Sequence, residues 1–276
     1  MSEFSAQFMN ALADSGLSMH KGDAIGDGAL HRYRVDGDKA GSLNGWYVLN
    51  LDDKPFGAFG SWKTGQSCTW TVIRPETMTP ADRAALAARM AEAKRARDAE
   101  LVKVRAEAAT RAARLWRKSR PASNQHPYLA RKCVQAYGIR LLGQSLVIPL
   151  RDVSGQLHSL QFIMPGGEKR FITGGRKRGC YYAIGRPGDD LCICEGYATA
   201  ASIHEATGYA TASAFDAGNL EPVARALRSK FPRLRLILCA DNDAETPGNP
   251  GIQYAEAAAR AVRGLLAVPT FEGVSA

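Results

Sequence analysis

The sequence predicts a chain of mixed architecture, with an α/β part at its carboxyl end and α+β parts before it. After Asp190, short apolar strands alternate with helices, which is typical of a parallel sheet covered on both faces. Between Leu146 and Ile184, candidate strands follow one another with only glycine-containing turns between them, which indicates an antiparallel sheet. A small β-rich module and a long charged helix are expected before residue 120.

The composition is that of an ordinary globular protein. The 276 residues are 45% hydrophobic and 23% charged, which excludes a mostly disordered chain. There is no apolar run of membrane-spanning length and no signal-peptide pattern, so we expect a soluble, cytoplasmic protein without a membrane partner. The six cysteines form no CxxC pair and therefore predict neither a zinc ribbon nor a disulfide framework.

The net charge of +9 suits a polyanionic partner. Residues 1–78 are expected to form the β-rich module, after a helix over Ser5–Gly16. Its candidate strands are His31–Val35, Trp46–Leu51, Gly57–Trp62 and Cys68–Ile73. The many aromatic residues of this module form either the core of a small sheet or, beside Arg32, Arg34 and Lys63, a stacking surface for single-stranded nucleic acid.

Residues 79–120 are predicted to be a charged helical linker. The segment is rich in alanine and lacks glycine, and Pro80 follows Thr79, a good N-cap residue. Between Ala81 and Lys118 there are eleven basic and five acidic residues. These charges either only solvate an exposed helix or form an arm that contacts phosphates.

Residues 121–188 are expected to form an antiparallel α+β subdomain. A helix-containing connector over 124–138 precedes the candidate strands Leu146–Arg151, Leu157–Met164, Lys169–Thr173 and Cys180–Ile184. Residues 189–276 are expected to form a parallel sheet of about four strands between helices. The expected strands are Leu191–Cys194, Tyr209–Phe215, Arg235–Ala240 and Ala267–Phe271. The expected helices are Ala198–Thr207, Leu220–Phe231 with Asn219 as N-cap, and Ile252–Leu266.

Three carboxylates follow strands of this last sheet. Glu195 comes directly after the first strand, and Asp241 and Asp243 come directly after the third. Ligand sites of open α/β sheets form at the carboxyl ends of the strands, so the three acids are aimed at one crevice. Alternatively, the two aspartates cap the following loop and helix, and Glu195 forms an ion pair with a nearby lysine or arginine. The placement of all three acids at one edge favours a divalent-cation site with oxygen ligands.

The motifs around these acids resemble the Toprim domain. They are Glu195–Ala200 (EGYATA), Asp216–Leu220 (DAGNL), and Asp241-Asn242-Asp243 with Asn249-Pro250-Gly251 before an alanine-rich helix. More narrowly, the chain resembles the Toprim-domain DNA primases of plasmid conjugative transfer and of phage primase-helicases. The block from His126 to Phe171 is similar to the first part of their primase core, so that the resemblance spans about residues 120 to 266.

The resemblance implies a DNA primase that synthesises short oligoribonucleotides on a single-stranded DNA template. It uses nucleoside triphosphates and Mg²⁺ or Mn²⁺, and a helicase or other replication proteins are further implied partners. Glu195, Asp241 and Asp243 match the catalytic and metal-binding acids of the family. Such a site needs cations for the phosphates, and Lys169 is the one we expect to be catalytic. The predicted nucleotide- or nucleic-acid-binding residues are Arg131, Lys132, Lys169, Arg170, Arg176, Lys177, Arg178, Asp216 and Asn219.

Two other functions remain open from the sequence. The same acids would serve a metal-dependent Toprim nuclease with water as the nucleophile, and a Toprim fold without catalysis would be a single-stranded nucleic-acid-binding replication accessory. The chain has no Cys/His zinc ribbon and no GxxxxGK[ST] motif. We therefore expect a stand-alone primase or a fragment of a longer protein, in which the module over 1–78 substitutes for the ribbon or another chain provides that role.

Overall fold

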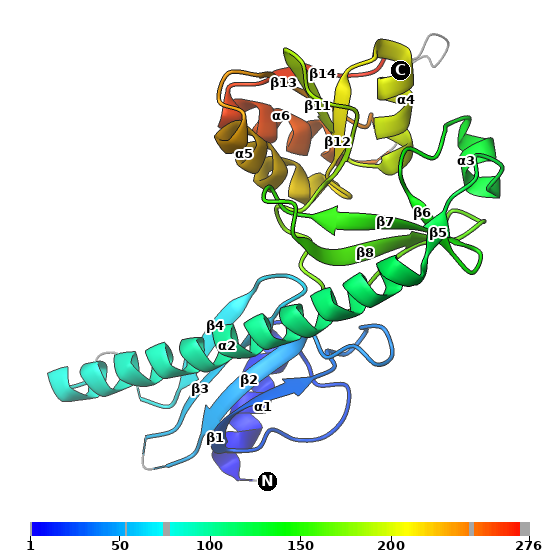
Figure 1. The fold of residues 1–276 in the computed structure, drawn as a ribbon. Coiled ribbons are helices and arrows are strands. Elements are labelled where there is room, and N and C mark those ends of the chain that lie inside the picture. The colour runs from blue at the N-terminus through cyan, green and yellow to red at the C-terminus, as the bar shows by residue number, and fades with distance from the viewer. Residues whose placement is uncertain (1, 53, 74–77, 243–245, 271–276) are drawn as a thin grey trace. The chain divides into compact units, whose positions relative to one another are not determined.

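The protein is described by a computed structural model that covers residues 2–52, 54–73, 78–242 and 246–270. The chain divides into two compact units, Met1–Lys103 and Val104–Ala276. The boundary falls within the long helix α2 (Pro80–Lys118), which contributes residues to each unit. Figure 1 shows the order of the elements along the chain.

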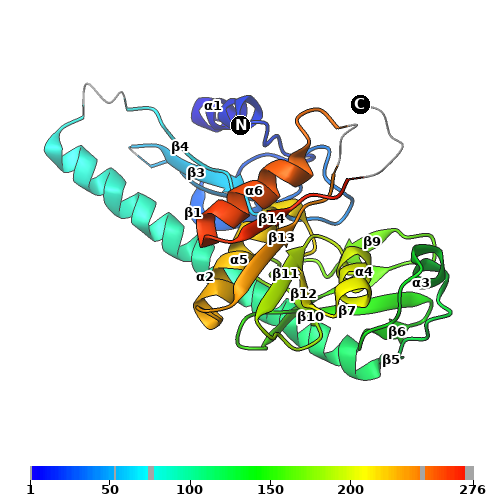
Figure 2. The same ribbon diagram turned by 90° about the horizontal axis from the view of Figure 1, so that it is seen from above.

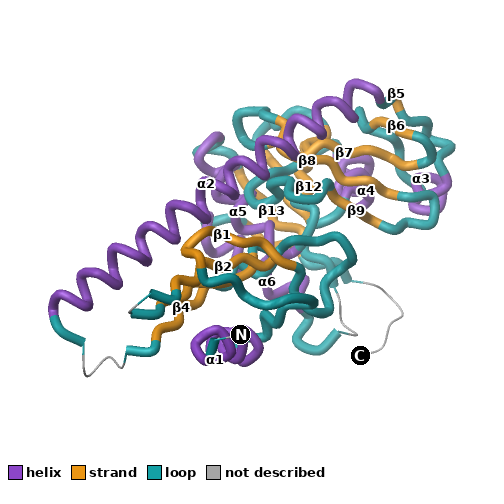
Figure 3. The backbone as a smooth tube through the Cα atoms, turned by 90° about the horizontal axis from the view of Figure 1, so that it is seen from below, coloured by secondary structure: helices purple, strands orange, loops and turns teal. Residues whose placement is uncertain are grey.

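The first unit is an antiparallel sheet covered by one helix on each face. The sheet order is β1-β2-β3-β4. Its strands are β1 (Asp27–Tyr33), β2 (Gly45–Asn50), β3 (Phe56–Ser61) and β4 (Ser67–Thr71). Helix α1 (Glu3–Asp14) packs on one face through Phe8, and α2 packs on the other through Ala93. Figure 3 shows the backbone of the sheet and of both helices. The β-rich module expected from the sequence is therefore present.

Most aromatic side chains of this unit form its core. In the strands, those with at most 5% exposure are Tyr33, Trp46, Tyr47, Phe56 and Phe59. Phe8 meets Phe59 edge to face, with 5.4 Å between the ring centroids. Trp62 is half-buried, and the guanidinium of Arg32 lies 4.9 Å from the centroid of its ring. Since buried rings are not accessible to bases, the core interpretation is confirmed for the five buried residues.

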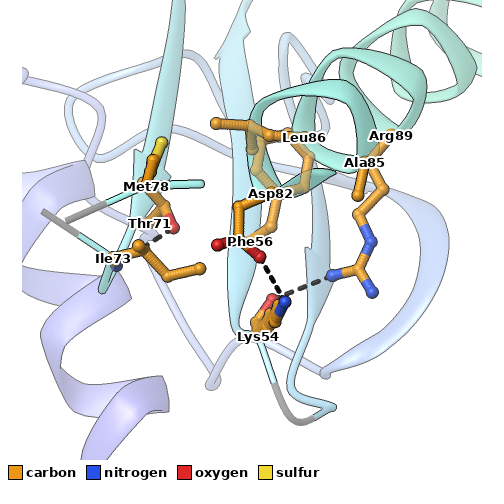
Figure 4. A pocket seen from close by; sticks show the side chains of 9 residues that line it. All are labelled: Lys54, Phe56, Thr71, Ile73, Met78, Asp82, Ala85, Leu86 and Arg89. Carbon is orange, nitrogen blue, oxygen red and sulfur yellow. Dashed lines mark hydrogen bonds and ion pairs between the residues drawn. The ribbon is translucent and has the colours of Figure 1, made fainter. Parts of the chain in front are cut away.

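Helix α2 begins where the sequence predicts. The hydroxyl of Thr79 accepts a hydrogen bond from the N–H of Asp82 at 3.1 Å, and the Asp82 carboxylate accepts one from the N–H of Thr79 at 3.1 Å. Asp82 also pairs with Lys54, whose carbonyl accepts a 2.8 Å hydrogen bond from Arg89 (Figure 4). The small cavity beside them holds about 20 Å³. These contacts attach the first turns of α2 to the sheet.

The second unit contains two sheets, of which the first is antiparallel. Its order is β5-β6-β7-β8-β9, and α3 (Pro127–Lys132) lies between β5 and β6 in the chain. The strands are β5 (Arg120–Pro121), β6 (Arg140–Leu142), β7 (Ser145–Arg151), β8 (Leu157–Ile163) and β9 (Lys169–Phe171). Ala112 of α2 packs against Val147 and Leu160 of this sheet. The rest of that part of α2 is largely solvated, as expected.

The other sheet, here called the C-terminal sheet, has the order β10-β12-β11-β13-β14. Its strands are β10 (Tyr182–Ile184), β11 (Asp190–Cys194), β12 (Ala210–Ser213), β13 (Arg235–Cys239) and β14 (Leu265–Ala267). The last four are parallel, which confirms the predicted four-stranded parallel sheet. Helix α4 (Tyr197–Thr207) covers one face, and α5 (Leu220–Lys230) and α6 (Pro250–Val262) cover the other (Figure 2).

The position of β10 differs from the sequence prediction. The strand Cys180–Ile184 was expected in the antiparallel subdomain, but β10 pairs antiparallel with β12 in the C-terminal sheet, with Ala183 opposite Ala212. Within the described residues, the antiparallel sheet reaches this segment through the single bridge between Arg151 and Tyr181. Packing decides the pairing, because the ring of Tyr182 lies 6.0 Å from that of Tyr197 in α4.

The end of α6 also differs. A helix over Ile252–Leu266 was expected, but α6 ends at Val262 because Arg263 adopts a left-handed conformation with φ of 51°. The N–H of Gly264 then bonds to the carbonyl of Ala259 at 2.9 Å, as in a Schellman motif. The chain continues as β14, which takes the place of the strand expected over Ala267–Phe271. Among the described residues, no helix has the length and apolar character needed to cross a bilayer.

Candidate active site

Two of the three predicted acids leave the same edge of the C-terminal sheet. Strands β11 and β13 are adjacent and parallel, with Ile193 opposite Leu238. Glu195 follows β11 directly, and Asp241 lies two residues after β13. Both residues are partly exposed, although one carboxylate oxygen of Glu195 is buried. We call this part of the sheet the acidic edge. Asp243 lies outside the described residues.

The thiol of Cys194 lies near both carboxylates. Burial raises the pKa of Cys194, and the charges of Asp241 and Glu195 raise it further. Each charge must be near the sulfur to have this effect, since coulombic interactions weaken with distance. The register of the strands and the electrostatics of Cys194 therefore agree that Glu195 and Asp241 converge.

The backbone of Glu195 is fixed by the neighbouring strand. Its carbonyl accepts hydrogen bonds from the N–H of Phe215 at 2.6 Å and from the hydroxyl of Ser213 at 3.0 Å. Phe215 has φ of 75°, a conformation that a non-glycine residue adopts at a cost. The sequence analysis predicts no role for Ser213 or Phe215. No motif could have indicated one, because both residues bond to the backbone carbonyl of Glu195, which is distant in the chain.

Asn242, the residue next to Asp241, is held by side-chain amide contacts. Asn249 donates a 2.8 Å hydrogen bond to the Oδ1 atom of Asn242, whose own amide lies 3.4 Å from the carbonyl of Pro269. Asn249 has φ of 42°, and asparagine is among the residues that tolerate this left-handed conformation. Asn249 therefore provides the left-handed turn that precedes Pro250 and helix α6. Its side chain also holds Asn242, the residue next to Asp241.

Lys169 reaches the acidic edge from the antiparallel sheet. A Cβ atom on Gly196 would lie 3.9 Å from Nζ of Lys169, so the ammonium group lies against the turn that follows Glu195. Side chains alternate between the faces of a strand, and the neighbouring Arg170 pairs instead with Glu168 at 2.9 Å. Of these two predicted cations, the structure brings only Lys169 to the turn that follows Glu195.

Lys177 and Asp216 form an ion pair next to the same turn. Asp216 directly follows Phe215, which holds the carbonyl of Glu195. The ammonium of Lys177 also lies 5.4 Å from the ring centroid of Phe171, whose ring meets that of Phe215 at 6.1 Å. These contacts connect the two residues to the turn at Glu195.

The other predicted cations lie elsewhere in the described part of the second unit. Arg131 donates to the carbonyl of Pro165 at 3.3 Å, and Lys132 is exposed at the end of α3. Arg176 lies 3.7 Å from the carboxylate of Asp152, and Arg178 lines a cavity beside the same aspartate. No hydrogen bond or ion pair between described residues joins these four side chains to Glu195 or Asp241.

Asn219 lies at the N-cap position of α5, as the sequence predicts, but its side chain is used elsewhere. Its side chain makes no capping hydrogen bond, because a 3₁₀ turn, η2 (Ala217–Asn219), precedes the helix. The side chain is 2% exposed and bonds to the loop before β10 instead. Its Oδ1 accepts from the N–H of Gly179 at 2.8 Å, and its amide lies within 3.2 Å of the carbonyls of Lys177, Cys180 and Ala214. Asn219 therefore fixes the loop that carries Lys177.

The donors at the acidic edge fit a hard divalent cation. Glu195 and Asp241 provide carboxylate oxygens, which such ions prefer, and both residues are partly exposed. Within the described residues there is no group of three His, Cys, Asp or Glu side chains that would hold a metal. The third predicted ligand, Asp243, lies outside these residues.

Comparison with known proteins supports the assignment of the C-terminal sheet. Residues 189–268 match the Toprim domain. Two Escherichia coli proteins named DNA primase TraC are 39% and 36% identical to the chain over 281 and 279 residues. Each alignment covers 96% of this chain, but only 19% and 26% of the two primases. The chain thus spans about a fifth to a quarter of the length of these relatives.

Solved primase structures show weaker similarity. The primase fragment of the bacteriophage T7 primase-helicase is 14% identical, with a TM-score of 0.42, and the alignment covers 56% of this chain and 67% of that one. The catalytic core of DnaG is 13% identical, with a TM-score of 0.36 and coverage of 57% and 66%. The assignment therefore rests on the sequence comparisons: residues 189–268 match the Toprim domain, and the chain is similar to a part of the DNA primases named TraC.

Proposed function

We propose that this chain is the catalytic segment of a DNA primase that makes short oligoribonucleotides on single-stranded DNA. The observation that carries the proposal is the convergence of Glu195 and Asp241 at one edge of the C-terminal sheet, with the ammonium of Lys169 beside the turn after Glu195. Negative groups that hold a cation and a positive group that holds phosphate are the two requirements of phosphoryl transfer. The similarity to TraC over 96% of the chain adds to this support.

In the proposed reaction, the 3′-hydroxyl oxygen of the primer forms a bond to the α-phosphorus of a nucleoside triphosphate. The bond from that phosphorus to the bridging oxygen of the β-phosphate breaks, pyrophosphate leaves with the electron pair, and the hydroxyl proton passes to solvent. Glu195 and Asp241 would hold Mg²⁺ or Mn²⁺, which supplies Lewis acidity and lowers the pKa of the attacking hydroxyl. Lys169 would pair with phosphate oxygens and orient the triphosphate.

Lys177 is expected to assist from the rim of the site. Its pairing with Asp216 and its position over Phe171 restrict the ammonium group before any ligand arrives. An incoming phosphate would compete with Asp216 for this charge, so Asp216 sets the strength of the contact.

The proposal is tested by incubating the chain with single-stranded DNA, labelled ribonucleotides and Mg²⁺ or Mn²⁺. We expect labelled oligonucleotides that disappear when EDTA removes the metal and return when excess metal is added. A reaction with labelled DNA and metal but without nucleotides separates the alternatives. Shortened DNA would indicate a nuclease, and DNA binding without either product would indicate an accessory protein. Either result would overturn the proposal.

Lys169 and Arg170 offer a matched pair of variants on opposite faces of β9. Lys169→Gln should lower the rate of primer synthesis by about 10²-fold, the size expected when one stabilising donor is lost. Arg170→Gln removes the same charge from the residue that pairs with Glu168 and should change the rate by less than about threefold, since an exposed pair contributes little. Initial rates at saturating nucleotide provide the measurement. Equal losses in the two variants would contradict the role of Lys169.

A further inference from the structure

A second basic feature lies on the other side of the loop that carries Lys177. The second unit contains a cavity of about 450 Å³ whose polar lining is Arg105 of α2, Asp152, Arg176 and Arg178. Pro222 and Ala226 of α5 form part of its apolar wall. We call it the arginine cavity. None of its polar residues belongs to the acidic edge.

The arginines of this cavity are close to one another and incompletely compensated. Arg105, Arg176 and Arg178 line the same cavity, and partial burial and the charge of Arg176 both lower the pKa of Arg105. Among the described residues, no ion pair is formed by Arg105 or Arg178. Crowding like charges is unfavourable unless an anion offsets it.

The one carboxylate in the cavity is already satisfied by protein groups. Asp152 accepts hydrogen bonds from the hydroxyl of Ser154 at 2.6 Å and from His158 at 2.7 Å. Partial burial alone would raise the pKa of Asp152, but these bonds and those from nearby backbone N–H groups lower it to about 2. Arg176 lies 3.7 Å from its carboxylate. The carboxylate of Asp152 therefore interacts with Ser154, His158 and Arg176. The guanidinium groups of Arg105 and Arg178 can then bind a ligand.

The wall of the cavity is held in place by buried contacts. Asn219 binds the N–H of Gly179 and the carbonyls of Lys177 and Cys180, so both ends of the short segment with Arg178 are fixed. Arg176 also donates to the carbonyl of Arg178 at 3.1 Å. The loop thus directs Lys177 towards Asp216, and Arg176 and Arg178 towards Arg105.

We propose that the arginine cavity binds a phosphate group, in a second phosphate site distinct from the acidic edge. Guanidinium groups are well suited to phosphate because their planar donors match two of its oxygens. The proposal extends the proposed function, which supplies two sources of phosphate: the backbone of single-stranded DNA and the triphosphate of a nucleotide.

The test compares a double variant, R105Q/R178Q, with a charge-matched control, R114Q/R186Q. Arg114 and Arg186 are exposed residues of the same unit that do not line the cavity. Fluorescence anisotropy measures binding of labelled oligo(dT), and in a second arm of a fluorescent ATP analogue, both in EDTA so that the acidic edge carries no metal. Circular dichroism checks that each variant is folded.

We expect R105Q/R178Q to weaken the binding of one ligand about tenfold relative to the control. For DNA, the slope of log K against log salt should also become shallower by about 0.7 for each phosphate that the variant no longer neutralises. Loss of oligo(dT) binding assigns the cavity to strand phosphates, and loss of ATP binding assigns it to the nucleotide. If both double variants bind both ligands equally, the phosphate site is wrong even where primers are made. If R105Q/R178Q alone loses binding but the wild-type chain makes no primer, the site stands and the proposed function fails.

Discussion

Replacing Asp241 with Asn or Glu195 with Gln is expected to lower primer synthesis by at least about 10³-fold. Lewis-acid stabilisation is worth several kcal/mol, and each 1.4 kcal/mol corresponds to about tenfold in rate. The two substitutions keep the shape of each side chain but remove the charge that holds a divalent cation. The measurement is the initial rate of labelled primer formation, across a titration of Mg²⁺ and Mn²⁺.

A control with the same change of charge is available at the other end of β11. Asp189→Asn alters an exposed carboxylate next to the first residue of that strand, at the edge opposite Glu195. Its activity should stay within about twofold of the wild type, because surface charges far from a site have small effects. An Asp241→Asn protein that keeps more than a tenth of the wild-type rate would remove the basis of the mechanism.

DNA binding in EDTA distinguishes a catalytic defect from a folding defect. Asp241→Asn should bind oligo(dT) in EDTA at least as tightly as the wild type, because no metal is bound there and the substitution removes a negative charge that repels phosphate. A variant that loses both synthesis and metal-free binding, with a lower melting temperature, would indicate that Asp241 acts in folding.

Asn219→Ala is expected to give the largest loss of stability. The substitution leaves the N–H of Gly179 and buried carbonyls, including those of Cys180 and Ala214, without their partner. Each buried polar group left unsatisfied costs about 1–3 kcal/mol, so we expect the free energy of unfolding to fall by about 3 kcal/mol. For a unit of this size that corresponds to a decrease in melting temperature of about 6–12 °C, measured by circular dichroism.

Further variants at this position separate the two interpretations of Asn219. Ser and Asp are good N-cap residues, so Asn219→Ser or Asn219→Asp would preserve stability if the side chain capped α5. In the structure the side chain must both accept and donate, which neither replacement does with the same reach. We therefore expect both variants to be destabilised. Wild-type stability in either one would restore the capping interpretation and contradict the structure.

The Asn219 variants also connect stability to function. The loop that Asn219 fixes carries Lys177 on one side and Arg176 and Arg178 on the other. At a temperature where Asn219→Ala is still folded, its affinity for oligo(dT) should fall if the arginine cavity binds the strand. Unchanged affinity would indicate that the arginines bind DNA without a fixed loop.

Local patterns were enough to predict the strands that end at the acids. Strand β11 is a short apolar run that stops at Glu195, and β13 is another that stops just before Asp241. The alternation of strands and helices implied parallel pairing, and parallel strands place their carboxyl ends at one edge. The convergence of Glu195 and Asp241 could therefore be read from the sequence, whereas Asp243 lies outside the described residues and its role stays a prediction.

Contacts between distant segments decided the rest. The residues around Tyr182 do not predict that β10 pairs with β12. In the same way, the residues around Asn219 do not predict that its side chain bonds to a loop about forty residues earlier. Likewise, Arg105 is one of eleven basic residues in a helical run, and only the packing of the second unit places it beside Arg176.

The sequence by itself thus determined the order and type of most elements and the position of the acids, because hydrophobic periodicity and turn residues act over a few neighbouring residues. The tertiary structure alone decided which cation lies against the turn after Glu195 and which cations gather in the arginine cavity. Lys169 and Arg176 carry the same charge and lie in one short segment, and only the folded environment distinguishes them.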